Sequence, residues 1–320
     1  MAVRTRRAAA TSEPVHDLPH IANGGFGWRG RARAVLRLAG FLGWTLSMIP
    51  VQMVLLRLPG SAKARFPQMF HRVLCRILGV QVVVHGVPAP VHPVLFIANH
   101  SSWLDIPVLS TAAPLSFVAK SEVRAWPLFG LMSQLQRTVY VERARRTHAA
   151  RHRDALAERL RAGDALVLFA EGTSSDGNRV LGFKTALFSA AETPVPVAGA
   201  ETAGAETGVL VQPVAIAYTR LNGMPMGRDL RPFFAWYGDM ELGPHLWQAL
   251  QMGPLTSEIV FLEPVRLADL GSRKALARHC QAQVAGALGA ALRGAATGWP
   301  GAVALADPAP APSHTDPAGL

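Results

Sequence analysis

Cysteine is scarce in this sequence: the 320 residues include two, Cys75 and Cys280. They lie far apart, and their spacing matches no metal-binding motif. The sequence therefore indicates neither a disulfide framework nor a metal site, and we expect a reducing compartment. It also lacks a Gly-x-Ser-x-Gly motif, the tight turn that presents a nucleophilic serine in many hydrolases.

Acidic residues are outnumbered, with 21 Asp and Glu against 32 Lys and Arg and a pI near 10.9. A basic surface attracts nucleic acid, anionic lipid or an acidic protein. The mean hydropathy of +0.21 is high for a soluble nucleic-acid binder, and no recognition-helix or base-stacking motif is present. We therefore expect anionic membrane lipids as partners, and no nucleic acid.

One long segment has no charged residue. It runs for nineteen residues from Leu38 to Leu56, about the length that crosses a hydrocarbon core as a helix. Pro50 and Gln52 interrupt its apolar character, and arginines flank both ends. The segment predicts a membrane-anchoring helix, for which a full span and an in-plane position both remain open; a soluble core helix is the alternative.

Composition divides the chain into four segments. Residues 1–33 and 299–320 predict disordered tails, the first basic and the second rich in Ala and Pro, because neither offers enough apolar surface to form a core. Residues 34–78 predict a membrane-associated helical segment that ends in an amphipathic helix at 66–78. Residues 79–298 predict one folded domain.

Within that domain, apolar strand-like runs alternate with helical patterns. We predict strands at 80–86, 93–100, 115–120, 137–143, 165–172 and 209–218, a helix from Ser101 or Ser102 to Leu109, and an Arg-rich helix at 144–161. Such alternation is typical of an α/β fold with a mixed, partly parallel sheet flanked by helices.

Two polar loops follow apolar strands, at Asn99–Asp105 (NHSSWLD) and at 169–177 (FAEGTSSDG). His100 and Asp105 would diverge by about 140° on one straight helix. If His100 stays in the turn and Asp105 enters the first helical turn, the carboxylate can orient the imidazole, whose other nitrogen is then free as a base. A solvated turn is the alternative, but two such loops at strand ends favour a site.

These residues resemble the glycerolipid acyltransferase family, which includes the 1-acyl-glycerol-3-phosphate acyltransferases. NHSSWLD resembles its His-x4-Asp motif, and three further blocks follow in the family's order: residues 120–130 with 137–143, FAEGTSS at 169–175, and VQPVAIAY at 211–218. Together they cover about residues 80–220, which makes 79–298 the acyltransferase domain of such a protein.

The resemblance implies an O-acyltransferase that moves a fatty acyl chain from a thioester donor, acyl-CoA or acyl carrier protein, to the hydroxyl of a lysolipid. It implies His100 as general base supported by Asp105, with neither a metal nor a cofactor. The implied acceptor-binding residues are Arg143, Glu171, Gly172 and Thr173. Because no serine elbow is present, we predict direct transfer without an acyl-enzyme. The implied location is the cytoplasmic face of the inner membrane.

The third block departs from the family pattern: Ala170 and Ser174 stand where Pro and Arg are common. Loss of that Arg removes a natural bidentate partner for phosphate, although basic residues within 169–184 can still supply positive charge. The stretches 169–184 and 235–240 are more similar to the lyso-ornithine-lipid acyltransferase branch. Both acceptors remain open, with lyso-ornithine lipid favoured over 1-acyl-glycerol-3-phosphate.

Three alternatives remain. They are a membrane-bound transacylase of the same fold, a hydrolase of the same fold, and a basic membrane-surface scaffold without catalysis, against which the intact His100 and Asp105 argue. The Arg-rich segment 142–161 fits a solvated helix face, or a contact with anionic headgroups or an acyl carrier protein.

Overall fold

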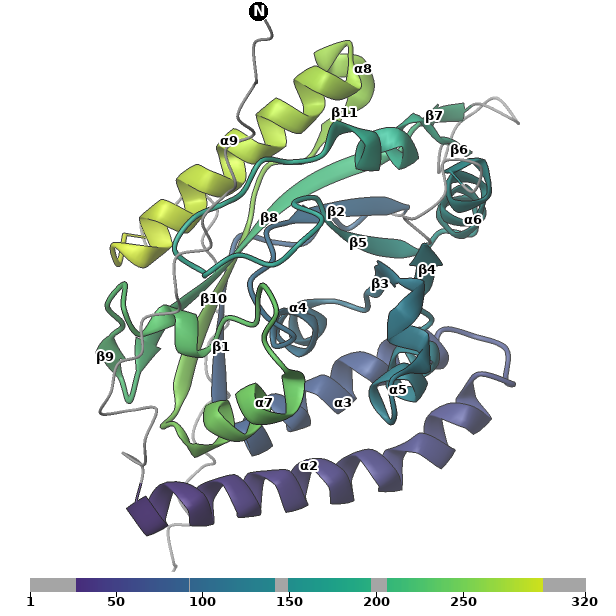
Figure 1. Ribbon diagram of the computed structural model, residues 1–320. Helices are drawn as coiled ribbons and strands as arrows, with labels where there is room; N and C mark the ends of the chain where they lie inside the picture. Colours follow the sequence, from purple (N-terminus) through teal and green to yellow (C-terminus); the bar gives the residue numbers. More distant parts are fainter. Residues whose placement is uncertain (1–26, 92, 142–148, 197–205, 296–320) are drawn as a thin grey trace, which may run out of the picture.

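A computed structural model describes residues 27–91, 93–141, 149–196 and 206–295, with side chains at 154–195 in the third of these ranges and from 207 onward in the fourth. Its main sheet has the strand order β1-β10-β8-β2-β5-β3-β4 (Figure 1). The strands are β1 (Val80–His85), β10 (Leu255–Phe261), β8 (Leu210–Leu221), β2 (Val94–Ala98), β5 (Ala165–Phe169), β3 (Ser116–Lys120) and β4 (Val139–Val141).

The five strands from β8 to β4 run parallel, whereas β10 is antiparallel to β8 and carries β1 parallel to itself. The short strands β9 (Met224–Pro225) and β11 (Val265–Arg266) extend β8, and β6 (Pro194–Pro196) pairs with β7 (Glu206–Gly208) apart from the main sheet. This architecture confirms the predicted mixed α/β fold. All the predicted strands are present, with ends that differ by a few residues.

Helices cover both faces of the sheet, which explains why every residue of β2 and β5 is buried and apolar. One face packs against α2 (Gly27–Leu55), α3 (Ala62–Leu78), α4 (Asp105–Ala112) and α7 (Leu242–Gln251), with α5 (Phe129–Leu135) beside them (Figure 1). The other packs against α6 (Ala149–Arg161), α9 (Arg273–Leu292) and the 3-10 helix η3 (Thr185–Glu192). The short helix α8 (Leu267–Leu270) precedes α9, and η1 (Ser121–Ala125) and η4 (Arg231–Phe233) lie in loops.

Two helices, α2 and α3, form the described part of the N-terminal segment. Since α2 begins at Gly27, residues 27–33 are helical, which corrects the predicted limit of the disordered tail. Gly30 and Ala34 are small and lie buried on the same face of α2 as Phe41. The first turns of α2 therefore pack against the protein on the same side as the later turns. Residues 1–26 and the predicted tail at 299–320 lie outside the described residues.

Helix α4 begins at Asp105, later than the predicted start at Ser101 or Ser102. The backbone N–H groups of both serines donate to the Asp105 carboxylate, so they form a turn in front of the helix instead of its first residues. Pro107 fits the first helical turn because that turn has no use for its missing N–H. The delayed start leaves His100 outside the helix, as the contact with Asp105 requires.

Candidate active site

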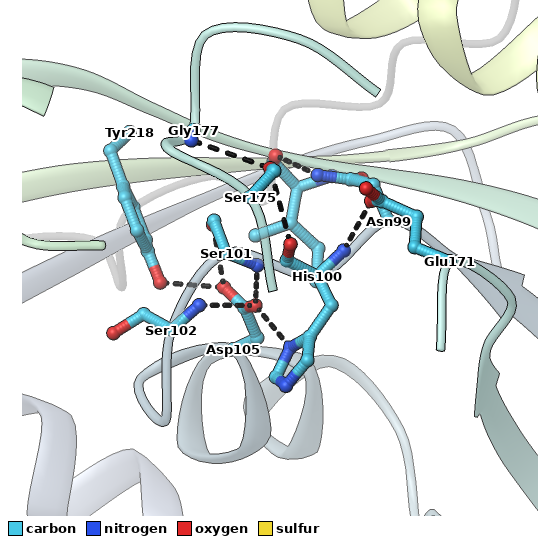
Figure 2. A network of polar contacts seen from close by, with 10 residues as sticks. Asn99, His100, Ser101, Ser102, Asp105, Glu171, Ser175, Gly177 and Tyr218 are labelled. Atoms are coloured by element: carbon cyan, nitrogen blue, oxygen red, sulfur yellow. Dashed lines mark hydrogen bonds and ion pairs between the residues drawn. The ribbon is translucent and has the colours of Figure 1, made fainter. Parts of the chain in front are cut away.

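The turn that follows β2 brings His100 against Asp105. His100 Nδ1 lies 2.8 Å from Asp105 Oδ2, and the two side chains are 19% and 0% exposed (Figure 2). The predicted contact is therefore present. Because a carboxylate accepts hydrogen bonds, Nδ1 carries the proton in this contact, and the remaining ring nitrogen of a neutral imidazole is an acceptor.

Asp105 is buried, yet both of its oxygens are hydrogen-bonded. Oδ2 also accepts from the N–H groups of Ser101 at 2.7 Å and Ser102 at 3.0 Å, and Oδ1 accepts from the hydroxyl of Tyr218 at 2.5 Å (Figure 2). A buried charge without such partners would cost several kcal/mol. The donors keep the carboxylate in place without access to water.

The His100 ring lies flat on the ring of Phe169, the last residue of β5. The ring centroids are 4.0 Å apart with planes inclined by 18°, and Phe169 in turn stacks on Phe117 of β3 at 6.0 Å. Stacking fixes the plane of the imidazole, while the bond to Asp105 fixes its rotation within that plane. The next two strands of the sheet therefore set the direction of the free ring nitrogen.

Glu171 binds backbone on both sides of the site. Its Oε1 accepts from the His100 N–H and its Oε2 from the Leu181 N–H, each at 2.8 Å, and the residue is 1% exposed. Burial raises the pKa of Glu171 to about 7, partly offset by these two N–H donors. The structure thus places Glu171 as a brace between two loops, and the acceptor contact that the resemblance implies for it stays a prediction.

Gly172 and Thr173 line the cavity described below, on the loop that follows β5. Gly172 has φ +70°, and an added Cβ would lie 2.8 Å from Lys184 Nζ, so a larger residue would be strained there. Their roles in acceptor binding stay predictions. Arg143, the fourth residue of that implied group, lies outside the described residues.

Two other loops hold the His100 turn by its backbone. The N–H of Ser175 donates to the carbonyl of His100 at 2.9 Å, and the N–H of Trp236 donates to the carbonyl of Ser101 at 2.7 Å. Asn99 exchanges two hydrogen bonds with the backbone of Ile216 in β8. The first, third and fourth sequence blocks, which are far apart in the chain, therefore meet at one turn.

A largely apolar cavity of about 550 Å³ opens at His100. Its walls come from α2, α3, α4 and α5 and include Phe41, Met48, Phe70, Ile106, Phe129 and Met132. Besides histidine, the charged side chains among the described lining residues are Lys120 and Glu122. The described parts of the chain bring no three His, Cys, Asp or Glu side chains together in a geometry suited to a metal ion. The arrangement offers a base at the edge of a space suited to hydrocarbon.

Known proteins resemble this chain in sequence and in fold. The profile of a family described as Acyltransferase matches residues 81–217. The chain is 49% identical to the lyso-ornithine lipid O-acyltransferase of Brucella abortus, over 83% of this chain and 97% of that protein. It is 43% identical to the same enzyme of Rhizobium meliloti, over 83% and 88%.

More distant matches concern a different acceptor. The 1-acyl-sn-glycerol-3-phosphate acyltransferase of Neisseria gonorrhoeae is 35% identical over 62% of this chain and 70% of that protein. The crystal structure of the 1-acyl-sn-glycerophosphate acyltransferase from Thermotoga maritima superimposes with a TM-score of 0.57 at 24% identity, over 82% of this chain and 96% of that one. That similarity supports the fold.

Proposed function

Because the chain belongs to the glycerolipid acyltransferase family, we propose that this acyltransferase moves a fatty acyl group from a thioester donor to the hydroxyl of lyso-ornithine lipid. The donor is acyl-CoA or acyl carrier protein. The observation that carries the proposal is the contact of 2.8 Å between His100 and buried Asp105 at the edge of a cavity of about 550 Å³.

His100 acts as general base in this reaction. Its free ring nitrogen takes the proton of the acceptor hydroxyl while the oxygen attacks the thioester carbonyl, and Asp105 stabilises the imidazolium that forms. The C–S bond then breaks, and the proton passes from His100 to the leaving thiolate. Holding both substrates at one site contributes by orientation. The acyl group goes directly to the acceptor, without an acyl-enzyme.

Sequence identity and charge support lyso-ornithine lipid as the acceptor. The two relatives of this kind are 49% and 43% identical, against 35% for the glycerol-phosphate enzyme of Neisseria gonorrhoeae. Lyso-ornithine lipid carries one carboxylate and one ammonium group, and the cavity presents Lys120 and Glu122. A phosphate would favour a second cation, yet Ser174 replaces the arginine common in the family.

Helix α2 supports an in-plane position at the membrane. It is long and apolar enough to cross a bilayer, but it lies across α3, α5 and α7 (Figure 1). Its polar Gln52 faces the protein, where its amide donates to the carbonyls of Lys63 and Leu135. The opposite side exposes apolar residues, among them Val35, Leu36, Leu42, Leu46, Met53 and Val54. A helix with one face on the protein and the other in lipid lies along the surface. We place that surface at the cytoplasmic side of the inner membrane.

Lipid product analysis tests the acceptor. The purified protein is presented with lyso-ornithine lipid, 1-acyl-glycerol-3-phosphate and lysophosphatidylethanolamine together, with one labelled acyl thioester. We expect label in ornithine lipid first. Label in phosphatidate instead would reject the acceptor, transfer without any thioester would indicate a transacylase, and labelled protein in quenched-flow samples would reject direct transfer.

The variant His100→Ala tests the base. Transfer should fall by at least about a hundredfold, the usual minimum contribution of a positioned base, while folding and vesicle binding stay unchanged. His279→Ala, a change on α9 across the sheet, is the matched control and should retain activity. Wild-type turnover by His100→Ala would remove His100 from the mechanism.

A further inference from the structure

Tyr218 lies behind the His100–Asp105 pair, on a different element from either residue. It belongs to β8, opposite Ser257 of β10, and its side chain is 2% exposed. Its ring packs near Phe234 at 6.5 Å between centroids, on the sheet face that carries α4. Among the described residues that line the cavity Tyr218 is absent, so it has no place to touch a substrate there.

The hydroxyl of Tyr218 is the closest donor to one oxygen of Asp105. It lies 2.5 Å from Oδ1, whereas the next donor to that oxygen, the hydroxyl of Ser101, lies 3.4 Å away (Figure 2). The three other donors, including His100, share Oδ2. Rotation of the carboxylate would break the bond to Tyr218 and the bond to His100 together. The two ends of the carboxylate are thus fixed from opposite sides.

The hydroxyl also keeps its proton. Burial, and next the negative charge of Asp105, raise the pKa of Tyr218 well above its ordinary value. It is therefore a permanent donor at any pH at which the enzyme works. By drawing electron density from Oδ1, it reduces the negative charge that Asp105 presents to the imidazolium.

We propose that Tyr218 is a positioning residue of the acyl transfer. It holds the Asp105 carboxylate toward His100 and reduces the negative charge that this carboxylate presents to the imidazole. The role rests on the proposed function of the pair. Tyr218 acts through Asp105 and does not contact the reacting atoms.

The variant Tyr218→Phe removes the hydroxyl and keeps the ring. We expect kcat to fall about tenfold to a hundredfold, in line with the loss of one bond to a charged group, with KM for both substrates within about twofold of wild type. The matched control is Tyr140→Phe, which loses a hydroxyl bonded to Ser133 at 2.6 Å, away from the pair. It should keep its kcat, and equal losses in both variants would overturn the proposal.

The pH profile separates positioning from general packing. The titratable groups that face His100 are Asp105 and Glu171, with Tyr218 behind Asp105. Loss of the Tyr218 hydroxyl changes both the direction and the charge of the Asp105 carboxylate that faces His100, so the acid limb of kcat/KM should move. Glu171 is not bonded to Tyr218 and does not produce that move. An unmoved limb contradicts the proposal.

Two further measurements test the same role, and the first does not require Tyr218→Phe to fold. In the variant Tyr140→Phe/Tyr237→Phe, Tyr218 is the one tyrosine of the sequence that remains, and its replacement by 3-fluorotyrosine makes a stronger donor. The acid limb should then move to lower pH than in the unfluorinated variant. In an Asp105→Asn background, Tyr218→Phe should cost less than about twofold, because its partner is already changed. A full loss there overturns the proposal.

A spectroscopic signal distinguishes this proposal from the proposed function. The proton on His100 Nδ1 should give a downfield NMR resonance that is absent in Asp105→Asn. It should shift or broaden in Tyr218→Phe and stay in place in Tyr140→Phe. If the wild-type protein transfers no acyl group, the proposed function fails while this signal still tests the role of Tyr218; an unmoved resonance in Tyr218→Phe contradicts it.

Discussion

Burial changes the acid–base behaviour of two side chains beside the cavity. It raises the pKa of Glu171 to about 7, and it lowers the pKa of His71 in α3 to about 4, because each charged form would have to leave water. The Nδ1–H of His71 donates to the carbonyl of Pro67 at 2.7 Å, which fits a neutral ring. As pH rises, the contribution of Glu171 to the free energy of unfolding falls, whereas the contribution of His71 increases.

Glu171→Gln should remove one part of the pH dependence of stability. The folded pKa of Glu171, about 7, lies above the ordinary 4.5, so the folded wild type binds a proton that the unfolded chain releases between these values. Its stability from this group therefore falls as pH rises through that window, by about 3 kcal/mol. The melting temperature of Glu171→Gln in detergent should lie further below wild type at pH 5 than at pH 8. An equal difference at both pH values would contradict the assignment.

His71→Leu should change the opposite slope. The pKa of His71 in the folded protein, about 4, lies below the ordinary 6.5. The contribution of His71 to the free energy of unfolding is therefore fully present above pH 6.5 and is lost as the pH falls toward 4. By pH 5 the wild type has lost about 2 kcal/mol that the leucine variant keeps. Melting from pH 8 to pH 5 measures this. His279→Leu, on α9, is the control and should retain the wild-type slope.

The residues of the pair could be predicted from the sequence because both belong to one short motif. Tyr218 and Phe169 could be placed at strand ends but not beside His100, since their contacts depend on how β8 and β5 flank β2. The contacts of Glu171 could not be predicted either, because its partners are backbone N–H groups, which no residue type in the sequence marks.

At the scale of elements, α2 has two faces with different surroundings. Its buried residues, Gly30, Ala34, Phe41, Thr45 and Gln52, recur along one side. The sequence could not predict which side of α2 is buried, because an apolar run has the same composition whether one side of the helix or none of it packs on the protein. Packing against α3, α5 and α7 supplies the missing distinction.

Leu46→Glu tests the lipid contact proposed for the exposed side of α2. A carboxylate there would have to stay in water or enter the bilayer interface, so we expect vesicle binding to weaken by about tenfold or more. Val87→Glu is the matched control, since Val87 is 60% exposed and Leu46 61%, and Val87 lies in the loop after β1. Co-sedimentation with anionic vesicles measures both. Equal binding by the two variants would reject the lipid contact.

Strands that a helix connects to the next strand could be predicted from the sequence, whereas β10 could not. The parallel strands β2, β3 and β5 are apolar runs that end in polar loops. Strand β10 contains Thr256, Ser257 and Glu258, and it enters the sheet between β1 and β8, which precede it by long stretches of chain. The residues of β10 are buried because the strand lies between β1 and β8, and the local sequence pattern does not predict that position.

At the scale of the whole molecule, the cavity extends from the His100 turn to α2. His100 lines it at one strand end, and Met48 and Phe41 line it from α2. The proposed function therefore predicts that an acyl chain lies along these apolar walls with its thioester at His100. The size of this space should limit the length of the chain that reacts.

Met48→Trp should shift the chain-length preference. The larger side chain takes up space in the cavity, so long acyl thioesters should lose about tenfold in kcat/KM relative to chains a few carbons shorter. Leu46→Trp, on the exposed side of the same helix, is the matched control and should keep the wild-type ratio. Competition between thioesters of several lengths measures the ratio. A ratio unchanged in Met48→Trp would remove the cavity from length selection.

Arg37 fastens α2 to the end of α7: its guanidinium donates to the carbonyls of Leu250 and Met252 at 3.1 and 2.7 Å. A shortened chain that starts after α2 would leave these two carbonyls without their Arg37 donor and would remove one wall of the cavity at His100. Solubility is better sought by polar substitutions on the outer side of α2, with the helix itself retained.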